Sequence, residues 1–378
     1  MTDNPLRQLE ALGQSLWLDY IRRDLITSGE LQRLIEADGL RGMTSNPAIF
    51  EKAITGSHDY DRDIQAMAQA GQGAEAIYEA LSQRDVQSAA DTFRPLYEGT
   101  GGLDGYVSLE VNPHLARNTE GTLREARRLW AALARPNVFI KVPATAEGLP
   151  AIRQLISEGI NVNVTLLFGL PRYREVAEAY VAGLEARLAQ GQDLSRIASV
   201  ASFFVSRLDT LVDPLLDQKI AQGGTAAGLA KQALGQVATA SAKLAYQGFK
   251  ELFQGERFQP LANHGARVQR LLWASTGTKN PAYSDVKYIE ALIGPDTVNT
   301  VPVETLNAYR DHGVPRATLD QDAQAAAAIL ARLAGLGLNL DALTQQLEDE
   351  GVQKFNEPFD KLMAALAERA SPAAARKP

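Results

Sequence analysis

The sequence lacks several features that define whole classes of protein. Cysteine is absent from all 378 residues, which excludes disulfide bonds, thiolate nucleophiles and zinc–thiolate sites. The formal net charge is −7 and no block of lysine and arginine stands out, so a nucleic-acid-binding surface is not expected. Apolar runs stay well short of the roughly 18 residues of a membrane span, and the polar start does not resemble a signal peptide. We therefore expect a cytoplasmic protein that binds neither nucleic acid nor a membrane.

What the chain does contain is a regular alternation of short apolar runs and amphipathic stretches. The expected strands span 15–19, 39–44, 106–111, 138–142, 161–166, 197–203, 270–274 and 297–301. Several are apolar on both faces, as is typical of parallel strands that are buried on both sides. Eight alternations of strand and helix predict a protein of the α/β class, a single (β/α)8 TIM barrel. A doubly wound open sheet is the alternative, although such sheets usually have fewer strands.

Two stretches exceed what a simple barrel needs. Residues 221–253 are helix-prone and lie between the sixth and seventh strands, and residues 319–370 add helices after the last strand. The late helices are expected to cover the bottom of the barrel, to close over its mouth or to form a subunit contact. We expect one domain over residues 1–370 and a disordered tail at 371–378.

Polar residues gather at the C-terminal ends of the expected strands. In a (β/α)8 barrel these ends form the mouth where active sites lie. Burying an isolated charge there is costly unless the charge is paired, so a structural explanation would need a partner for each one. The positions concerned are Asp19, Thr44 to Asn46, Glu110, Lys141, Asn163, Thr165, Ser202 and Ser275.

Lys141, in the stretch VFIKVPAT, is the most informative of these positions. Its β-branched and aromatic neighbours indicate a buried amine, and burial favours the neutral, nucleophilic form. Such an amine can condense with a ketose carbonyl and use the iminium as an electron sink. The alternative is a structural salt bridge with Asp19 or Glu110.

The two carboxylates also allow two interpretations. Positioned acids could share the proton transfers of imine formation and of carbon–carbon cleavage. Alternatively, Asp19 could cap the helix after its strand, and Glu110 could serve only as an ion-pair partner of Lys141. His114 follows Glu110 at a spacing of four, but Pro113 and the strand context argue against a metal site.

Seven motifs occur in an order that resembles the transaldolase family. They are TSNPAIFEKAI, SLEVNPHLARNTEGT, FIKVPATAEG, INVNVTLLF, ASFFVSRLD, ASTGTKNPAYSD and VNTVPVETL. The last two extend the likeness to the longer bacterial form of that family. The likeness runs from about Leu16 to Leu306, which is most of the chain.

The resemblance implies a role for each matching residue. Lys141 is similar to the Schiff-base lysine, Asp19 to the acid/base aspartate of carbon–carbon cleavage, and Glu110 to the glutamate that acts through a water also held by Thr165. The substrate-binding positions are Asn46 and Asn163 for the dihydroxyacetone unit, Ser202 and Phe204 for the pocket wall, and Arg207 and Ser275 for the sugar phosphate.

One position departs from the family pattern. Shorter transaldolases carry an arginine soon after the serine of the seventh strand, whereas this chain reads ASTGTKN. Lys279 is the candidate replacement for that arginine. Lysine can hold a phosphate as a point charge, but it lacks the bidentate fork of arginine.

The resemblance also implies the reaction. Dihydroxyacetone would pass between sedoheptulose 7-phosphate and glyceraldehyde 3-phosphate, giving erythrose 4-phosphate and fructose 6-phosphate, a step of the pentose phosphate pathway. It implies sugar-phosphate substrates and no cofactor or metal, and we expect a monomer or a homodimer.

A fructose-6-phosphate aldolase, which releases dihydroxyacetone, differs where Glu110 and Phe204 stand. A non-catalytic sugar-phosphate-binding barrel would be expected to lack Lys141 or Asp19.

Overall fold

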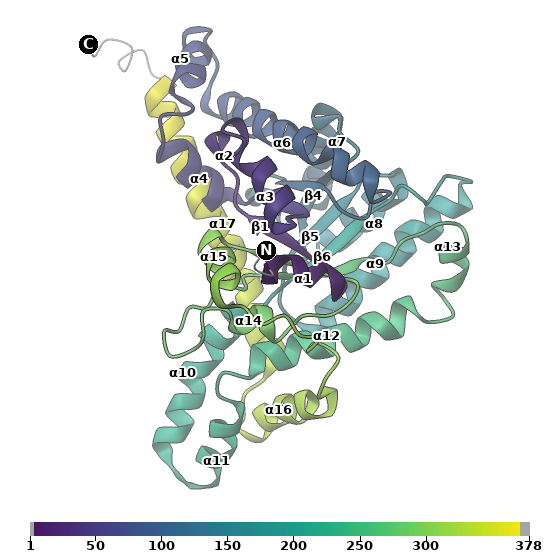
Figure 1. Ribbon diagram of the computed structural model, residues 1–378, viewed down its shortest axis with the longest axis vertical. Coiled ribbons are helices and arrows are strands. Elements are labelled where there is room, and N and C mark those ends of the chain that lie inside the picture. The colour runs from purple at the N-terminus through teal and green to yellow at the C-terminus, as the bar shows by residue number, and fades with distance from the viewer. Residues whose placement is uncertain (1–3, 371–378) are drawn as a thin grey trace.

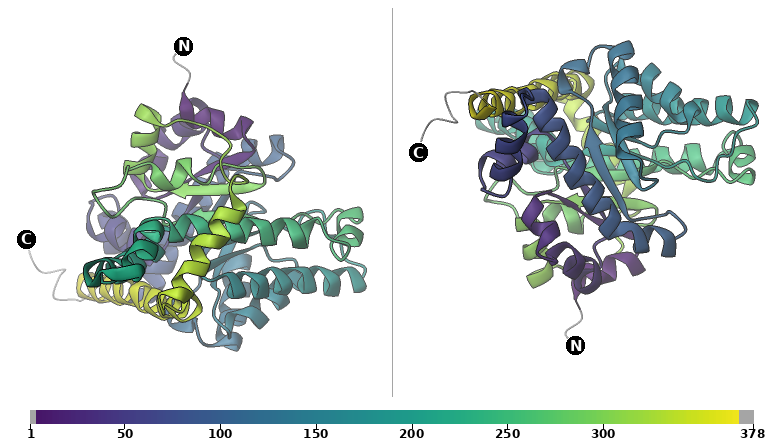
Figure 2. Two further views of the ribbon diagram at one scale, coloured as in Figure 1. Left: turned by 90° about the horizontal axis from the view of Figure 1, so that it is seen from below. Right: turned by 90° about the horizontal axis from the view of Figure 1, so that it is seen from above.

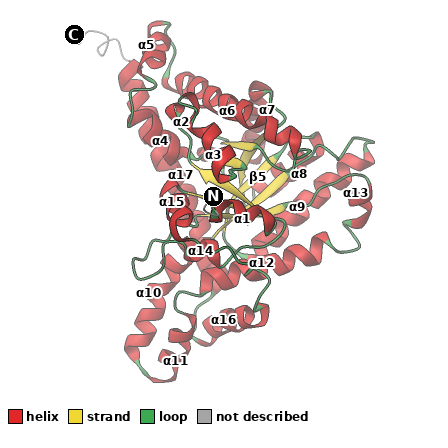
Figure 3. Ribbon diagram, in the orientation of Figure 1, coloured by secondary structure: helices red, strands yellow, loops and turns green. Residues whose placement is uncertain are grey.

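The computed structural model describes residues 4–370, and the tail expected at 371–378 lies outside this range. Eight parallel strands form a closed barrel in which each strand pairs with the next and the last pairs with the first. The predicted (β/α)8 barrel is confirmed, and the open doubly wound sheet is wrong. Helices surround the strands on the outside (Figure 3). The strands are β1 (Gln14–Asp19), β2 (Gly42–Thr44), β3 (Tyr106–Glu110), β4 (Val138–Pro143), β5 (Val162–Leu167), β6 (Ser199–Phe204), β7 (Arg270–Ala274) and β8 (Thr297–Val301).

The second strand is shorter than the sequence predicts. Gly39 has φ 71° and ends the preceding helix in a left-handed conformation, so the chain enters the sheet only at Gly42. Gly42 pairs with Trp17, whose indole would lie 2.5 Å from any added Cβ. A glycine is therefore required for the β1–β2 pair to close over this large buried ring.

Helices begin at residues with recognisable capping chemistry. The side chain of Asn46 accepts a hydrogen bond from the backbone N–H of Ile49, and Pro47 occupies the first turn of the same helix. The helices near the first five strands are α1 (Pro5–Ala11), α2 (Arg23–Thr27), α3 (Glu30–Asp38), α4 (Pro47–Thr55), α5 (Asp61–Gln69), α6 (Ala74–Gly99), η1 (Pro113–Leu115), α7 (Thr119–Leu133), α8 (Gly148–Glu158) and α9 (Leu170–Ala189).

The helix-prone stretches become two additions to the barrel. α10, α11 and α16 lie together at the lower end of the view in Figure 1, and α16 also packs on α12. The remaining helices are α10 (Ser206–Gln222), α11 (Gly224–Ala233), α12 (Val237–Phe253), α13 (Gln259–Asn263), α14 (Lys287–Glu290), α15 (Val303–His312), α16 (Ala323–Gly335) and α17 (Leu340–Ala370). Within residues 4–370 no single helix is long and apolar enough to span a membrane, and only the pair α16–α17, bent by 92°, meets that test jointly.

α17 lies across the mouth of the barrel rather than its bottom. It packs against α4 and η1, which directly follow β2 and β3, and against α5, α6 and β5. In both views of Figure 2 this helix, drawn in yellow, runs along one edge of the molecule. Ion pairs attach it to α4, α5 and η1 through Lys361–Glu51 at 2.6 Å, Arg369–Asp61 and His114–Asp360 at 2.6 Å. Two more reach α9 and the segment after η1: Arg172–Glu348 at 3.2 Å and Arg117–Asp349.

A second group of buried charges lies at the opposite end of the barrel. Arg270, the first residue of β7, donates hydrogen bonds to Asp104 at 3.0 Å and to Ser15 at 2.8 Å. Arg41 donates to the other oxygen of Asp104 at 2.7 Å. Burial alone would raise the pKa of the Asp104 carboxyl, but the two arginines outweigh it and hold that pKa below its ordinary value. Every charge in this group has a partner, as a structural role requires.

Candidate active site

A cavity of about 200 Å³ opens at the C-terminal ends of the strands. It collects every site residue predicted from the sequence except Glu110 and Asn163, which lie beside or behind it. Its lining consists of Asp19, Thr44, Asn46, Lys141, Thr165, Ser202, Phe204, Arg207, Ala274, Ser275, Gly277, Lys279, Thr300, Pro302 and Phe355.

Lys141 lies in β4 with its amine in this cavity. The residue is 4% exposed, and Nζ donates a hydrogen bond to the carbonyl of Ser45 at 2.9 Å. Nζ also lies 3.4 Å from Oε2 of Glu110, so the salt bridge considered for Lys141 is present. That ion pair does not remove the amine from the cavity. The structural and chemical interpretations are therefore compatible.

Glu110 is buried on β3 beside Lys141. Burial raises the pKa of the Glu110 carboxyl to about 7, against the opposing effect of the Lys141 charge. Within the described residues neither carboxylate oxygen accepts a hydrogen bond, apart from the ion pair to Lys141. Glu110 also borders a second, smaller cavity of about 20 Å³, lined by Tyr78 and Glu79 among others. A carboxyl with this pKa can both give and take a proton near neutral pH.

Asp19 ends β1 and is held by a short chain of hydroxyls. Thr44 donates to Oδ1 of Asp19 at 2.7 Å, and the hydroxyls of Thr44 and Thr300 lie 2.7 Å apart. Burial raises the pKa of Asp19, while Lys141, the hydrogen bond from Thr44 and the charges of Arg207 and Lys279 oppose that shift. The helix-cap alternative is wrong, because α2 begins only at Arg23 and Asp19 does not cap it.

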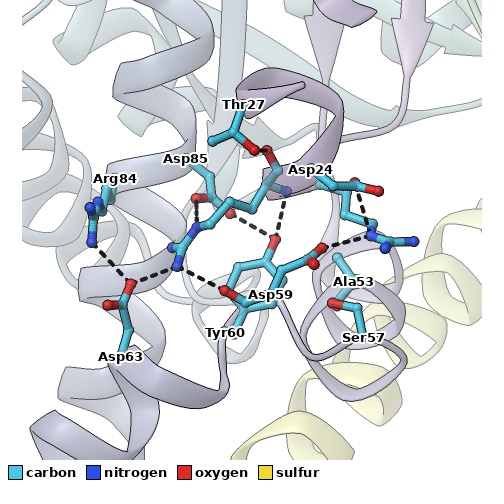
Figure 4. Close-up of polar contacts among 11 residues, drawn as sticks. Asp24, Thr27, Ala53, Ser57, Asp59, Tyr60, Asp63, Arg84 and Asp85 are labelled. Atoms are coloured by element: carbon cyan, nitrogen blue, oxygen red, sulfur yellow. Dashed lines mark hydrogen bonds and ion pairs between the residues drawn. The ribbon is translucent and has the colours of Figure 1, made fainter. Parts of the chain in front are cut away.

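The segment that follows Asp19 is fixed by a charged network (Figure 4). Arg23 donates to Asp85 at 2.9 Å and to Asp63 at 2.6 Å, which ties α2 to α6 and α5. Tyr60 donates to the second oxygen of Asp85 at 2.8 Å and accepts a hydrogen bond from the backbone N–H of Arg23 at 3.0 Å. These contacts restrict the position of the β1–α2 connection directly beside the cavity.

Asn163, Ser108 and Ser202 form a hydrogen-bonded group at the wall of the cavity. Asn163 is fully buried, donates to the hydroxyl of Ser108 at 3.1 Å and accepts from Ser202 at 2.6 Å. It lies behind the lining rather than in it, so the structure does not place it at the surface of the cavity. Asn46 lines the cavity, and because its amide oxygen caps α4, its amide nitrogen is the group available to donate a hydrogen bond.

Two cations, Arg207 and Lys279, line the cavity from the segments after β6 and β7. Arg207 lies with its guanidinium 5.2 Å from the centre of the Phe204 ring, and burial lowers its pKa below the ordinary value. Lys279 lines the same cavity from the segment after β7 and is exposed. Ser275 has φ 54° in the left-handed region, and its hydroxyl lies 3.1 Å from that of Ser206. Arg207, Ser275 and Lys279 in one lining form a candidate anion site in a chain of net charge −7.

Several lining residues were not predicted. Thr300 is the fourth residue of the expected strand TVNTV, and alternation along that strand could have placed it inward with Thr44. Phe355 comes from α17, and its ring centre lies 5.8 Å from Nζ of Lys141. Nothing in the local sequence QKFNEP distinguishes this aromatic residue from an ordinary core residue.

Comparison with known proteins identifies the family of this chain. A family profile described as Transaldolase/Fructose-6-phosphate aldolase matches residues 16–366. The chain belongs to the transaldolase/fructose-6-phosphate aldolase family. It is 48% identical to a Transaldolase of Trichodesmium erythraeum over 98% of each chain. It is 49% identical to Transaldolase 2 of Nostoc punctiforme over 98% of each chain. A Transaldolase of Thiobacillus denitrificans is 48% identical over 96% of this chain and 99% of its own.

These findings confirm the resemblance inferred from the motifs. Membership of the family and the names of the relatives support an enzyme with transaldolase function. They do not favour a non-catalytic barrel. The family description includes fructose-6-phosphate aldolase, so the choice between transfer and release depends on the cavity itself.

Proposed function

We propose that the protein transfers a dihydroxyacetone unit from sedoheptulose 7-phosphate to glyceraldehyde 3-phosphate through a Schiff base on Lys141. The products are erythrose 4-phosphate and fructose 6-phosphate, and the reverse direction uses the same groups. The observation that carries the proposal is the buried amine of Lys141, which lies in the cavity 3.4 Å from the Glu110 carboxylate. Lys141 attacks the ketose carbonyl and forms the iminium.

Glu110 and Thr165 serve imine formation. Glu110 takes a proton as the amine adds to the carbonyl and returns one as water leaves the carbinolamine. The hydroxyl of Thr165 is buried and has no hydrogen-bond partner among residues 4–370, which supports its use in holding the water that leaves or attacks. The pKa of about 7 at Glu110 suits both directions of this proton transfer.

Asp19 serves the carbon–carbon step. Its carboxylate accepts the hydroxyl proton of the ketose as the bond breaks, and it returns the proton when the acceptor aldehyde adds. The hydrogen bond from Thr44 supports this role because it orients one oxygen and leaves the other for substrate. Asn46 and Ser202 position the dihydroxyacetone unit, with Phe204 as the wall. Asn163 acts through Ser202, whose hydroxyl donates to its amide oxygen. Arg207, Ser275 and Lys279 bind the phosphate.

We further propose a cytoplasmic enzyme that folds as one domain over residues 1–370 and acts as a monomer or a homodimer. Its partners in this proposal are the sugar phosphates alone, with neither nucleic acid nor a membrane. The proposed steps require no cofactor.

Reduction with borohydride tests the Schiff base directly. With fructose 6-phosphate present, we expect one dihydroxyacetone adduct on Lys141, located by peptide mass spectrometry, and no adduct in Lys141→Ala. Lys231→Ala changes an exposed lysine of α11 and should leave the adduct intact. An adduct on another lysine, or full activity without any adduct, would refute the mechanism.

The release reaction of the same family is the second candidate. It is favoured only by the family description, while Glu110 and Phe204 support transfer. Formation of free dihydroxyacetone without an acceptor, at a rate that matches transfer, would favour release instead.

A further inference from the structure

Phe355 differs from the other residues that line the cavity. Each of the others lies on a barrel strand or within a few residues after one, whereas Phe355 belongs to α17. Its side chain is buried, with 4% of the residue exposed, and its ring centre lies 5.8 Å from Nζ of Lys141. The other neighbours of that amine are polar: the carbonyl of Ser45 and the carboxylate of Glu110. The ring therefore contributes an apolar wall beside the reacting nitrogen.

The position of this ring is fixed by the contacts of α17 on both sides of it. Before Phe355, Gly351 lies so close to β5 that an added Cβ would be 3.0 Å from the Leu166 side chain. One helical turn earlier, the buried Glu348 pairs with Arg172 at 3.2 Å. After Phe355, Lys361 pairs with Glu51 of α4 at 2.6 Å. A helix held to two different strand-end segments keeps the ring over the cavity.

We propose that Phe355 determines transfer over release by keeping water away from the carbon of the Lys141-bound enamine. This inference rests on the proposed Schiff-base transfer. It assigns the choice between the two reactions to a residue of the C-terminal helix in addition to Phe204.

The chemistry at the enamine shows why an apolar neighbour matters. In transfer, the enamine carbon forms a bond to the aldehyde carbon of the acceptor, the aldehyde oxygen takes a proton, and water then cleaves the resulting iminium. In release, the enamine carbon takes a proton instead, water adds to the iminium carbon, and the carbon–nitrogen bond breaks to give dihydroxyacetone and the free amine. Both routes end with water, so they diverge at protonation of the enamine carbon. Excluding water suppresses that side reaction.

The test compares release with transfer in the full-length enzyme. The release rate is the rate at which free dihydroxyacetone forms from fructose 6-phosphate without an acceptor. The transfer rate is the rate at which glyceraldehyde 3-phosphate forms from fructose 6-phosphate when erythrose 4-phosphate is added as the acceptor. For Phe355→Ala we expect the ratio of release to transfer to rise roughly tenfold, equivalent to about 1.4 kcal/mol in relative activation free energy. Phe355→Leu keeps the wall apolar and should change the ratio less.

Two further variants separate this effect from loss of helix packing. Leu362→Ala removes a fully buried side chain of α17 that does not line the cavity, and its ratio should match the parent. Phe355→Tyr keeps the ring and adds a hydroxyl that can hold water, so its ratio should rise even if Phe355→Ala does not fold. A parental ratio in every folded variant of Phe355 would overturn the inference. Loss of the borohydride adduct from parent enzyme would instead refute the Schiff base, so the two failures are distinct.

Discussion

At the scale of single residues, burial raises the pKa of both carboxyls at the mouth of the barrel, and the charge of Lys141 opposes that rise. Lys141 lies 3.4 Å from Glu110, and its charge also opposes the rise in the pKa of Asp19 that burial causes. The two carboxyls therefore differ in environment. Glu110 is buried without a hydroxyl partner in the described residues, whereas Asp19 accepts a hydrogen bond from Thr44. Such a difference suits one group to water chemistry at the imine and the other to the hydroxyl proton of the sugar.

Glu110→Gln should change the pH dependence of Schiff-base formation. Because the pKa of Glu110 is raised to about 7, the carboxylate is the base above that pH, and protonation removes it as the pH falls through about 7. We expect the parent rate of adduct formation to decline over that interval. The variant should be slower by roughly 10²–10⁴-fold and should lack this decline. Quenched-flow borohydride trapping with fructose 6-phosphate across the pH range measures both. The control Glu79→Gln, which changes a residue of the neighbouring cavity, should retain the decline. If Glu110→Gln showed the same decline as the parent, the titrating group would not be Glu110.

Arg207 and Lys279 give a second prediction at this scale. Arg207→Ala should raise KM for fructose 6-phosphate by roughly 10–100-fold, the equivalent of about 1.5–3 kcal/mol for a lost charge-assisted hydrogen bond. Lys279→Ala should have a smaller effect, because the exposed ammonium is already well solvated. Steady-state kinetics with fructose 6-phosphate and with unphosphorylated fructose measure the difference. A phosphate role is contradicted if KM for the phosphorylated sugar stays at its parental value in Arg207→Ala.

At the scale of elements, the sequence predicts the strands of the barrel more completely than the position of α17 at the cavity. All eight strands overlap the predicted ones, because strands buried on both faces are mostly apolar and carry only a few polar residues. β2 begins later than expected since Gly39 adopts a left-handed conformation at the end of α3. Residues at strand ends were predictable for the same reason, because the topology alone brings the C-terminal ends of parallel strands together.

The helices after β8 show where such prediction stops. Residues 319–370 are helix-prone on composition, but the face that α17 presents to the barrel depends on contacts with segments hundreds of residues away, such as Glu51 and His114. An aromatic residue in an amphipathic helix is most often part of a core, so Phe355 gives no local signal of a site. The cavity residues that lie on strands could therefore be predicted from the sequence pattern. Phe355 could not, because its position depends on the tertiary packing of α17.

At the scale of the whole molecule, buried charge occurs at both ends of the barrel with different consequences. At the mouth, polar atoms of Glu110, Thr165 and Arg207 lack hydrogen-bond partners within residues 4–370. At the opposite end, Asp104 accepts hydrogen bonds from both Arg41 and Arg270. Burial alone does not distinguish chemistry from structure, since Lys141 and Arg270 are both buried strand residues. Their positions along the strands separate them, because active sites of such barrels lie at the C-terminal ends of the strands, whereas residues at the N-terminal ends serve stability.

Asp104→Asn tests this division between stability and chemistry. Leaving Arg270 buried without its charged partner should lower the free energy of unfolding by about 3–5 kcal/mol. Asp104 has a lowered pKa in the folded protein, so its stabilising effect is present above the unfolded-state pKa of about 3.9 and is lost as the pH falls through the lower folded value. The difference between variant and parent should therefore be largest near neutral pH and shrink in acid.

Denaturant unfolding at several pH values measures this difference. The control is Asp320→Asn, which changes an exposed partner of Lys250 and should lower the free energy of unfolding by at most about 1 kcal/mol. The kcat of folded Asp104→Asn should equal that of the parent, and a large fall in kcat would instead connect this end of the barrel to the chemistry at its mouth.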